Sequence, residues 1–424
     1  MIQSSMNKMS DKPLRILMPS YRSHPFTGGQ GIYMRLVTKA MVELGHTVEV
    51  ISGQPYPILD EGVKLTKLPS LDLYSYDSPL KAFKFKLLKE PINLYEWLSH
   101  LSGGFSEPYT FGERMAVWGK KNYNRFDVVH DNQTLAYGLI KLRDMGVPVV
   151  GTIHHPITMD KRIDIKHAET LSLKLLKWRW YSFLKMQIKV ARQLDPIIVV
   201  SENTRKDVVK DFKIDPKKTR KVLHGIDHKT FEPIPSIKRK KNQLITTASA
   251  DVPLKGLIYL IRAYSDLLND FPDLSLIVIG KLRDGPTSKE LDKKGIKDKV
   301  KFISDLTSRQ IAELYAESTI AVSPSVYEGF GFPAGEAMSC GIPLISTNGG
   351  SLPEVVGDAG IIVPHSNPKA LKDAIKSLLD SPEKRIEFGD KGRERVLEKF
   401  TWNRAAKELV EVYREAIDNA DNRP

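Results

Sequence analysis

The sequence of 424 residues contains a single cysteine, Cys340, so no disulfide can form within one chain. Proteins without disulfides suit a reducing compartment, and we therefore expect a cytoplasmic location. No stretch approaches the roughly 18 uninterrupted apolar residues of a membrane-spanning helix, so none is expected. The first 13 residues are polar and lack the apolar segment of a secretory signal peptide, so we expect no such signal.

Acidic residues are outnumbered by basic ones, 51 against 64, which gives a net charge of +13. This excess predicts an anionic partner: nucleic acid, an anionic membrane surface or a phosphate-bearing substrate. Residues 161–192 hold nine basic residues against only Asp164 and Glu169, and residues 238–241 form another basic run. Each run is also compatible with a solvated surface or linker. Since no nucleic-acid-binding motif is present, we expect no nucleic-acid partner.

Strands and helices alternate from the start of the chain. Leu14–Met18 is an apolar run typical of a buried strand, and a glycine-containing loop, residues 24–31, follows it. Apolar residues at helical spacing predict an amphipathic helix over residues 32–44, and a second strand is predicted over Thr47–Ile51. Strand, glycine loop, helix and strand form the opening unit of a doubly wound parallel sheet.

The alternation is interrupted once, by Pro233, Pro235 and the basic run, and we predict a linker over residues 229–242. We expect two doubly wound, Rossmann-like α/β domains facing a central cleft, formed by residues 1–228 and 243–400. A polar-surfaced helix ends the chain, and we expect residues 401–424 to pack back toward the N-terminal domain. The strands predicted after the linker are Leu244–Ala248, Leu274–Ile279, Val300–Ile303, Ile320–Ser323, Pro343–Ser346 and Gly360–Val363.

Polar residues follow several predicted strands of the N-terminal half. Open parallel sheets bind ligands beyond the carboxyl ends of their strands, so these side chains are candidates for a binding site. They are His130, Asp131, His154, His155 and Ser201. A histidine at a strand end also occurs as a purely structural residue, and that alternative stays open for each of the three.

The most informative segment is residues 323–338, which follows a predicted strand and opens a helix near Pro333. Its glycines allow close backbone approach to a ligand, and the helix N-terminus favours a diphosphate. Glu328 precedes the glycine loop and Glu336 lies about one turn into the helix. Carboxylates are strong acceptors for paired hydroxyls, so Glu328 suits a sugar and Glu336 suits a ribose. The alternative is a turn followed by a helix-capping glutamate.

Glu328 and Glu336 reproduce the E-x7-E signature of retaining GT-B glycosyltransferases, and the stretch 328–343 resembles the signature of glycosyltransferase family 4. The resemblance extends over roughly residues 13–417. His224 stands where the family usually has asparagine. The other matching segments are Gly28-Gly29, Thr152-Ile153-His154, Val199-Val200-Ser201-Glu202, Gly225-Ile226-Asp227, Lys255-Gly256, Gly349-Gly350 and Pro353-Glu354.

The resemblance implies a glycosyltransferase that moves a sugar from a nucleotide-diphosphate sugar, with retention of anomeric configuration. It implies that Lys255 neutralises the leaving diphosphate, that His154 and Glu328 contact the donor sugar, and that Glu336 holds the ribose. The remaining donor-binding residues it implies are Gly28, Gly29, Gly329, Phe330, Gly331 and Phe332. Acceptor candidates are His130, Asp131 and His155, the last at a position where the family often has an acid.

Two absences bear on the chemistry. The arginine that the family usually carries about five residues before the Lys-Gly pair is missing, and Arg283 is a candidate to replace it. No Asp-x-Asp pair occurs anywhere, which favours a metal-independent mechanism that relies on Lys255 and helix N-termini. We therefore expect no metal and no cofactor besides the nucleotide sugar as co-substrate.

Residues 171–192 have the periodicity of one helix with Lys174, Lys177, Lys185, Lys189 and Arg192 on one face, beside Trp178 and Tyr181. The opposite face, which includes Leu176 and Trp180, is predicted to be the core face. A basic face with aromatic residues suits an anionic membrane surface, which would place the enzyme peripherally on the inner face of the membrane. An ordinary surface helix is the alternative. The acceptor is then a glycan or a lipid-linked glycan.

Other functions remain to be separated. A GT-B sugar phosphorylase or a nucleotide-sugar epimerase is the first alternative, and a basic nucleic-acid-binding protein is the second. A Rossmann dehydrogenase is disfavoured because residues 28–31 lack the G-x-G-x-x-G spacing and Ser52 stands where an acid is needed. The sequence leaves open the nucleotide base, the sugar, the acceptor, the linkage and the oligomeric state.

Overall fold

The computed structural model describes residues 12–25, 29–76, 78, 80, 83, 85, 89–248 and 252–421. The chain forms two compact units. Unit 1 comprises Met1–Val200, Thr204–Val222 and Ala405–Pro424, and unit 2 comprises Ser201–Asn203 and Leu223–Arg404. The segment 229–242 thus falls within unit 2. In the described part of the chain, no helix has both the length and the apolar character needed to cross a membrane.

Unit 1 contains a parallel sheet in the order β3-β2-β1-β4-β5-β6-β7. The order reverses between β1 and β4, which lie side by side although a long stretch of chain separates them. The strands are β1 (Arg15–Ser20), β2 (Thr47–Ser52), β3 (Lys64–Lys67), β4 (Val128–Asn132), β5 (Val149–Ile153), β6 (Ile197–Val199) and β7 (Thr219–Lys221).

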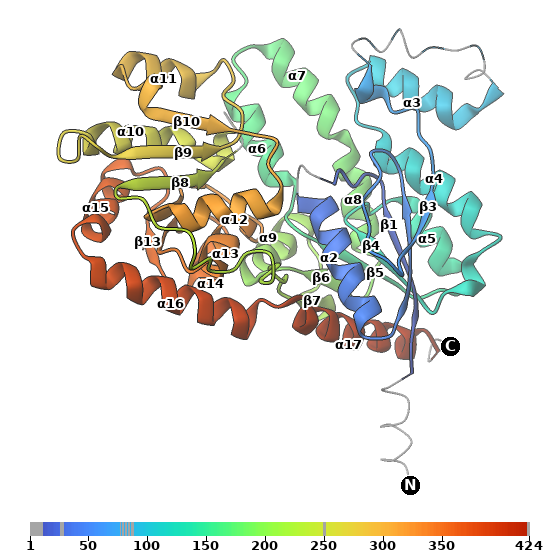
Figure 1. Cartoon of the computed structure of the whole chain (residues 1–424). Coiled ribbons are helices and arrows are strands. Elements are labelled where there is room, and N and C mark those ends of the chain that lie inside the picture. Colours follow the sequence, from blue (N-terminus) through green and yellow to red (C-terminus); the bar gives the residue numbers. More distant parts are fainter. Residues whose placement is uncertain are drawn as a thin grey trace. The chain divides into compact units, whose positions relative to one another are not determined.

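Helices cover both faces of this sheet (Figure 1). One face packs against apolar side chains of α4, α5, α8 and α9, and alternate strand residues such as Val129 point into that core. The helices are α2 (Gly29–Glu43), α3 (Pro91–Leu101), α4 (Glu107–Gly119), α5 (Tyr137–Asp144), α6 (Thr158–His167), α7 (Leu171–Trp180), α8 (Leu184–Ala191) and α9 (Glu202–Phe212), with short 3₁₀ turns η1 (Leu73–Ser75), η4 (Tyr123–Arg125), η5 (Tyr181–Phe183) and η6 (Pro216–Lys218).

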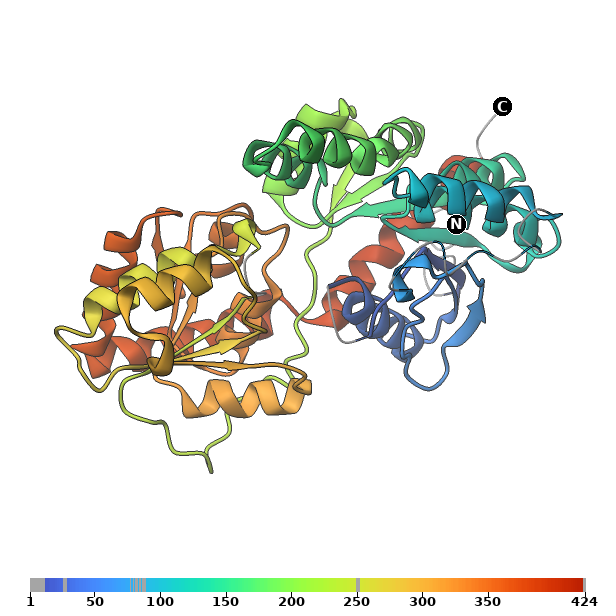
Figure 2. The same ribbon diagram turned by 90° about the horizontal axis from the view of Figure 1, so that it is seen from above.

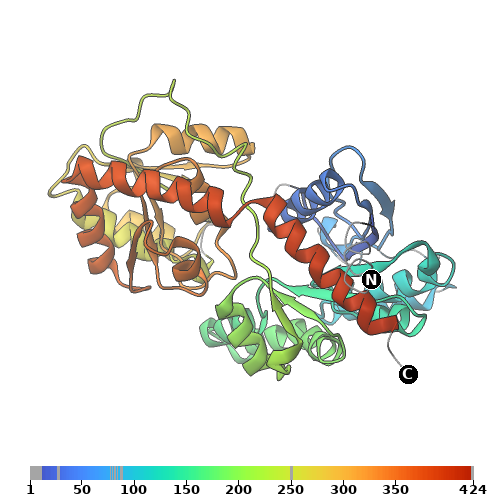
Figure 3. The ribbon, with the colours of Figure 1, turned by 90° about the horizontal axis from the view of Figure 1, so that it is seen from below.

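The last helix, α17 (Trp402–Asp421), contributes residues 405–421 to unit 1, along which it runs in Figure 3. Tyr413 is fully buried, and its hydroxyl forms a hydrogen bond with Nδ1 of His130 in β4. Arg220 donates a 2.8 Å hydrogen bond from Nε to Glu415 on the same helix. The C-terminal residues are therefore part of the core of unit 1.

Unit 2 contains a six-stranded parallel sheet in the order β10-β9-β8-β11-β12-β13, and helices α10 and α12 lie on opposite faces of it (Figures 1 and 2). Its strands are β8 (Gln243–Thr247), β9 (Ser275–Ile279), β10 (Val300–Ile303), β11 (Ile320–Ser323), β12 (Leu344–Thr347) and β13 (Ile361–Val363). Its helices are α10 (Leu257–Leu267), α11 (Pro286–Lys294), α12 (Ser308–Glu317), α13 (Phe332–Ser339), α14 (Leu352–Val356), α15 (Pro368–Leu379) and α16 (Pro382–Lys399), with 3₁₀ turns η7 (Pro253–Lys255) and η8 (Lys297–Lys299).

The two parallel sheets confirm the predicted α/β class with two doubly wound domains. The single helix predicted over residues 171–192 was wrong, because the 3₁₀ turn η5 separates α7 from α8. Tyr181 and Phe183 of η5 both enter an aromatic cluster with Phe105, whereas residues two apart on one α-helix point to opposite sides. Leu176, predicted to face the core, is 49% exposed.

Candidate functional site

The candidate site of unit 2 lies where the strand order reverses, between β8 and β11. Lys255 follows β8 and Glu328 follows β11, and Nζ of Lys255 lies 2.7 Å from Oε1 of Glu328. The hydroxyl of Ser325 donates a second hydrogen bond of 2.8 Å to the same carboxylate oxygen. Ligands of open α/β sheets bind at such a reversal, beyond the carboxyl ends of the strands. The structure thus brings together two of the three predicted catalytic residues at a preferred ligand position.

Backbone contacts fix the turn that carries Lys255. The carbonyl of Leu254 accepts a 2.8 Å hydrogen bond from the amide of Val326, which ties the turn to the segment before Glu328. Gly256 has φ 63°, and a Cβ placed on it would lie 2.1 Å from the carbonyl oxygen of Pro324. Only glycine combines this left-handed backbone with so close an approach.

The glycine loop after Glu328 is held from the other side by the turn 349–351. The carbonyl of Glu328 accepts hydrogen bonds of 3.0 Å from both the amide and the hydroxyl of Ser351. Gly331 adopts φ 99° as the residue that precedes α13, and Pro333 stands in the first turn of this helix. The loop therefore presents backbone groups and a helix N-terminus beside the Lys255–Glu328 pair.

Phe330 and Phe332, both predicted to bind the donor, point their rings into an aromatic cluster of unit 2. Phe332 stacks on His224 with ring centroids 5.5 Å apart, and Phe330 lies 5.1 Å from the same ring and is 4% exposed. Their rings therefore anchor the loop, and a donor contact from these two residues would come from the backbone. Gly329 lies between them and Glu328, and its carbonyl accepts a 3.3 Å hydrogen bond from Ser201.

Glu336 lies one turn into α13 and is only partly exposed. Burial, and then the nearby charge of Asp227, raise the pKa of its carboxyl to about 7. No described residue donates a hydrogen bond to this carboxylate, so its acceptor capacity is unused. An added pair of hydroxyl donors would stabilise the charged form.

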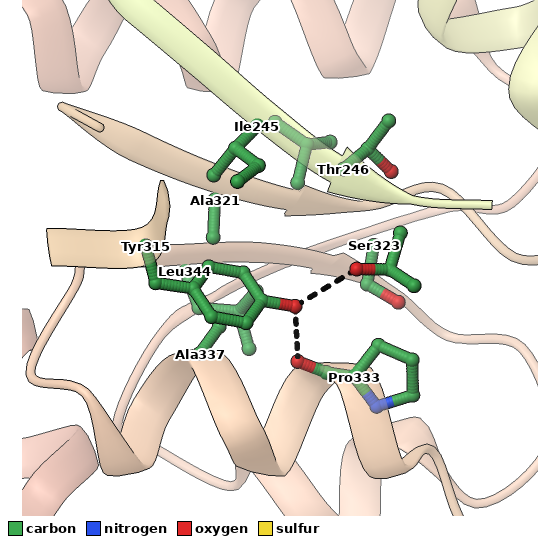
Figure 4. A pocket seen from close by; sticks show the side chains of 10 residues that line it. Ile245, Thr246, Tyr315, Ala321, Ser323, Pro333, Ala337 and Leu344 are labelled. Carbon is green, nitrogen blue, oxygen red and sulfur yellow. Dashed lines mark hydrogen bonds between the residues drawn. The ribbon is translucent and has the colours of Figure 1, made fainter. Parts of the chain in front are cut away.

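A small cavity of about 10 Å³ lies between the start of α13 and the strands β8 and β11, with Tyr315 in its wall (Figure 4). The hydroxyl of Tyr315 is 3.0 Å from Oγ1 of Thr247 and 3.3 Å from the carbonyl of Pro333, so it links the start of the helix to β8. A cavity of this size holds at most one water molecule. The cavity is therefore not a substrate pocket, and the hydrogen bonds of Tyr315 in its wall position α13.

In unit 1, His154 directly follows β5, and its ring packs edge-on against Tyr33 with centroids 4.7 Å apart. Its Nε2 lies 2.6 Å from Oδ1 of Asn132, and its amide donates to Oε1 of Gln133 at 2.6 Å. Burial lowers the pKa of His154 to about 3, so the ring is neutral at pH 7. Because an amide oxygen can only accept, Nε2 carries the proton.

His130 and Asp131 were expected at a strand end, but β4 continues through both of them to Asn132. His130 is fully buried, its Nε2 lies 2.6 Å from Oγ1 of Thr152, and burial lowers its pKa to about 3. With Tyr413 on its other nitrogen, this ring has the environment of a structural residue. Burial raises the pKa of Asp131 to about 7, and its Oδ1 has no hydrogen-bond partner in the described structure.

His155 adjoins the His154 cluster, because the side-chain amide of Gln133 donates a 2.8 Å hydrogen bond to its carbonyl. His155 is partly exposed and its Nε2 lies 2.9 Å from Oδ2 of Asp160. Gly29 is the first residue of α2, whereas Gly28 lies outside the described residues. Arg283 is exposed in the loop after β9, where it forms no ion pair with a described residue. Ser325 and Ser351, whose hydroxyls bond Glu328, could not be singled out beforehand, because serines are common in turns.

Comparisons with known proteins agree over most of the chain. The family model "Glycosyltransferase Family 4" matches residues 27–230, and the model "Glycosyl transferases group 1" matches residues 229–395. The chain is 42% identical over 409 residues to the MMP alpha-(1->4)-mannosyltransferase of Mycolicibacterium hassiacum, which covers 95% of this chain and 98% of that protein. It is 25% identical over 445 residues to a D-inositol 3-phosphate glycosyltransferase of Saccharomonospora viridis, with 96% and 95% covered.

Solved structures share the fold. The sucrose-phosphate synthase of Thermosynechococcus elongatus superimposes with a TM-score of 0.72 at 20% identity, covering 96% of this chain and all (100%) of that one. HepE of Anabaena, solved in complex with UDP and glucose, gives a TM-score of 0.69 at 16% identity, covering 95% of this chain and 100% of that one. At these identities the likeness shows the fold alone, which comprises two Rossmann-like domains.

Proposed function

Because the chain belongs to glycosyltransferase family 4 and is a glycosyltransferase of the GT-B fold, we propose that it transfers a mannosyl residue from a nucleotide-diphosphate mannose to a mannose-containing glycan. The observation that carries this proposal is the 42% identity, over nearly the full length of both chains, to an enzyme named for α-(1→4)-mannosyl transfer.

The geometry of unit 2 supports a specific division of labour. Lys255 is placed to neutralise the diphosphate as negative charge grows on it, and electrostatic stabilisation of this kind is a large term in catalysis. Its present partner, Glu328, is placed to accept hydrogen bonds from sugar hydroxyls. We propose that donor binding exchanges partners, so that the ammonium moves to the diphosphate and the carboxylate to the sugar.

The other groups complete the donor site. The unused acceptor capacity of Glu336 suits the two ribose hydroxyls, and the backbone of Gly329 and Gly331 with the start of α13 suits the diphosphate. In unit 1 we assign donor contacts to His154 and Gly29, and acceptor contacts to His155. We further propose that the reaction retains the anomeric configuration and needs no metal, with a diphosphate oxygen taking the proton of the acceptor hydroxyl.

The proposal is tested by incubating the protein with GDP-, UDP- and ADP-linked mannose and glucose, with and without an α-(1→4)-linked mannose oligosaccharide. Released nucleotide and elongated oligosaccharide are measured. We expect elongation from one mannose nucleotide only, and proton NMR of the product should show a new α-anomeric signal. Elongation from a glucose nucleotide alone, or a β-linked product, would contradict the proposed sugar or the retaining outcome.

A second proposal concerns location: a cytoplasmic enzyme held peripherally on an anionic membrane surface. Helix α7 has no buried side chain, and Leu171, Leu175 and Trp178 are 79%, 72% and 54% exposed. Lys161 and Lys185 place their ammonium groups 4.4 and 5.9 Å from the centroids of the Trp178 rings. Exposed apolar and aromatic residues among lysines are typical of interfacial helices. A lipid-linked glycan is then a suitable acceptor.

A further inference from the structure

A group of buried polar side chains with incomplete hydrogen bonding lies in unit 1, beside the reversal of strand order between β1 and β4. Tyr21 and Arg22 directly follow β1, and the electrostatic surroundings of the Tyr21 hydroxyl include both Glu107 and Asp131 of β4. Reversals of this kind are where open α/β sheets bind ligands. None of the sequence motifs described above covers Arg22, Tyr74 or Glu107.

Glu107, the first residue of α4, is a buried acid without a full set of partners. It is 7% exposed, and Nη1 of Arg22 lies 3.6 Å from its Oε2, beyond hydrogen-bond distance. Its Oε2 is buried and accepts no hydrogen bond in the described structure. Burial raises the pKa of this carboxyl to about 7, the direction expected for an acid with too few donors.

Two other polar atoms near Glu107 are also buried without a hydrogen-bond partner in the described structure. The hydroxyl of Tyr74 and Nη1 of Arg114 are buried and have no hydrogen-bond partner among the described residues. Both residues are electrostatically coupled to Glu107. Buried polar atoms are nearly always paired, so three unpaired atoms in one neighbourhood point to missing partners. Together they offer an acceptor, a donor and a hydroxyl that serves as either.

Aromatic rings surround the side chain of Tyr74. The ring of Tyr74 lies beneath the guanidinium of Arg22, 5.4 Å from it, and its centroid is 4.8 Å from His100 and 5.8 Å from Trp180. Trp180 also stacks on Phe105 at 4.9 Å. Tyr74, His100 and Trp180 are partly exposed, so the rings reach the surface. Apolar walls with a few convergent polar groups are the composition of a small-ligand site.

We propose that Arg22, Tyr74 and Glu107 form a subsite for one sugar ring of the acceptor glycan. The carboxylate accepts hydrogen bonds from sugar hydroxyls, the guanidinium and the phenol bond neighbouring oxygens, and the apolar face of the pyranose packs on the aromatic rings. An uncharged hexose suits this set better than a phosphate, because a carboxylate stands among the donors. This inference rests on the proposed function, which supplies mannose as the sugar.

The test measures binding and not turnover, so that it stays independent of the donor. An α-(1→4)-linked mannotriose is titrated by calorimetry into the wild-type chain and into Glu107→Gln, which keeps the size of the side chain and removes its charge. We expect Kd to rise at least tenfold in Glu107→Gln. Tyr74→Phe removes only a hydroxyl and should weaken binding less. Glu113→Gln, on the same helix and paired with Lys141, is the matched control and should bind as wild type.

Equal affinity of wild type and Glu107→Gln, or no binding of the mannotriose to the wild type, would overturn the subsite. Thermal melting of each variant shows that the chain is folded. Absence of mannosyl transfer in the activity assay would instead refute the proposed function, whatever the titration gives. Transfer kinetics add a second readout: Glu107→Gln should raise KM for the acceptor and leave KM for the donor unchanged.

Discussion

Nζ of Lys255 lies 2.7 Å from Oε1 of Glu328, although the two residues are separated by 73 positions in the sequence. Each stands just beyond one of the two central strands of unit 2, so the sheet itself sets their separation. The pair keeps a cation and a carboxylate together until a ligand offers better partners to both. The bare site thereby avoids leaving an unpaired charge in a half-buried place.

Replacing Lys255 by alanine should lower kcat about 10²- to 10³-fold, because the diphosphate loses its cation as its charge grows in the transition state. Lys376→Ala is the control, since Lys376 forms an exposed ion pair with Asp270 on the surface of the same unit. Steady-state kinetics with saturating donor measure the effect. If both variants lose the same activity, Lys255 has no special role.

Glu336→Ala should weaken binding of the cognate nucleotide by about 1.5–3 kcal/mol, because ribose hydroxyls lose a charged acceptor. Calorimetry with the nucleoside diphosphate measures this loss directly, and circular dichroism checks that the variant is folded. An unchanged affinity in a folded variant would remove Glu336 from the nucleotide site.

The pKa of Glu336, raised to about 7, adds a pH dependence to the same site. Nucleotide affinity should fall as pH drops below 7, since the protonated carboxyl is a poorer acceptor, and Glu336→Gln should abolish this dependence. The stability of the free protein changes in the opposite sense. Between pH 4.5 and 7 the folded state binds more protons at this group, so its contribution to stability decreases as pH rises.

Gly256→Ala should destabilise the protein more than Gly295→Ala, although the two glycines have nearly the same backbone, with φ of 63° and 65°. Both substitutions strain a left-handed residue by roughly 1–2 kcal/mol. Only the Cβ at position 256 would also meet a carbonyl oxygen, at 2.1 Å, whereas nothing lies within 4 Å of the one at 295. Denaturant unfolding of both variants measures the difference. Equal losses in the free energy of unfolding would mean that the turn at Gly256 relaxes to relieve the contact at no cost.

Transfer activity should survive dialysis against EDTA, because the mechanism proposed for Lys255 and the start of α13 supplies the charge that a metal would otherwise provide. Initial rates before and after chelation measure this. Loss of activity that Mg²⁺ or Mn²⁺ restores would show that a metal takes part.

Binding to vesicles containing anionic lipid should be stronger than binding to neutral vesicles, because each lysine near the anionic surface contributes about 1 kcal/mol at most. This binding should weaken in high salt, because salt screens the attraction. Changing Leu171 and Leu175 together to serine should reduce it. Ile386→Ser with Leu397→Ser, exposed apolar residues of α16, is the matched control. Lys185→Glu with Lys189→Glu tests the charge. Equal binding to both kinds of vesicle would make α7 an ordinary surface helix.

Most of the fold was predictable because buried parallel strands are continuous apolar runs; Ile320–Ser323, for example, has the same bounds as β11. The edge strands β3 and β7 gave no such signal, since Lys64–Lys67 and Thr219–Lys221 are largely polar. In β4 the polar residues His130 and Asp131 were taken for a strand end. Both residues continue the ladder with β5, and the ring of His130 is bonded by Thr152 and Tyr413.

The residues of the candidate sites were also only partly predictable from the sequence. Lys255, Glu328 and Glu336 were found because their local segments carry a motif. Arg22, Tyr74 and Glu107 lie in three separate segments, and only the folded chain brings them together. The apolar face of α7 was assigned to the core from its periodicity, but periodicity cannot say whether anything covers a face.

Tyr413 of α17 is fully buried in unit 1, yet the ribosome makes residues 405–421 only after it has made residues 223–404 of unit 2. At about 5–20 residues per second, the stretch from residue 223 to residue 404 takes roughly 10–40 s to synthesise. During that interval the sheet of unit 1 lacks the helix whose Tyr413 bonds His130 and whose Leu409 and Ala416 are buried in the finished chain. A chain that stops before residue 405 would therefore leave unit 1 unable to complete its core.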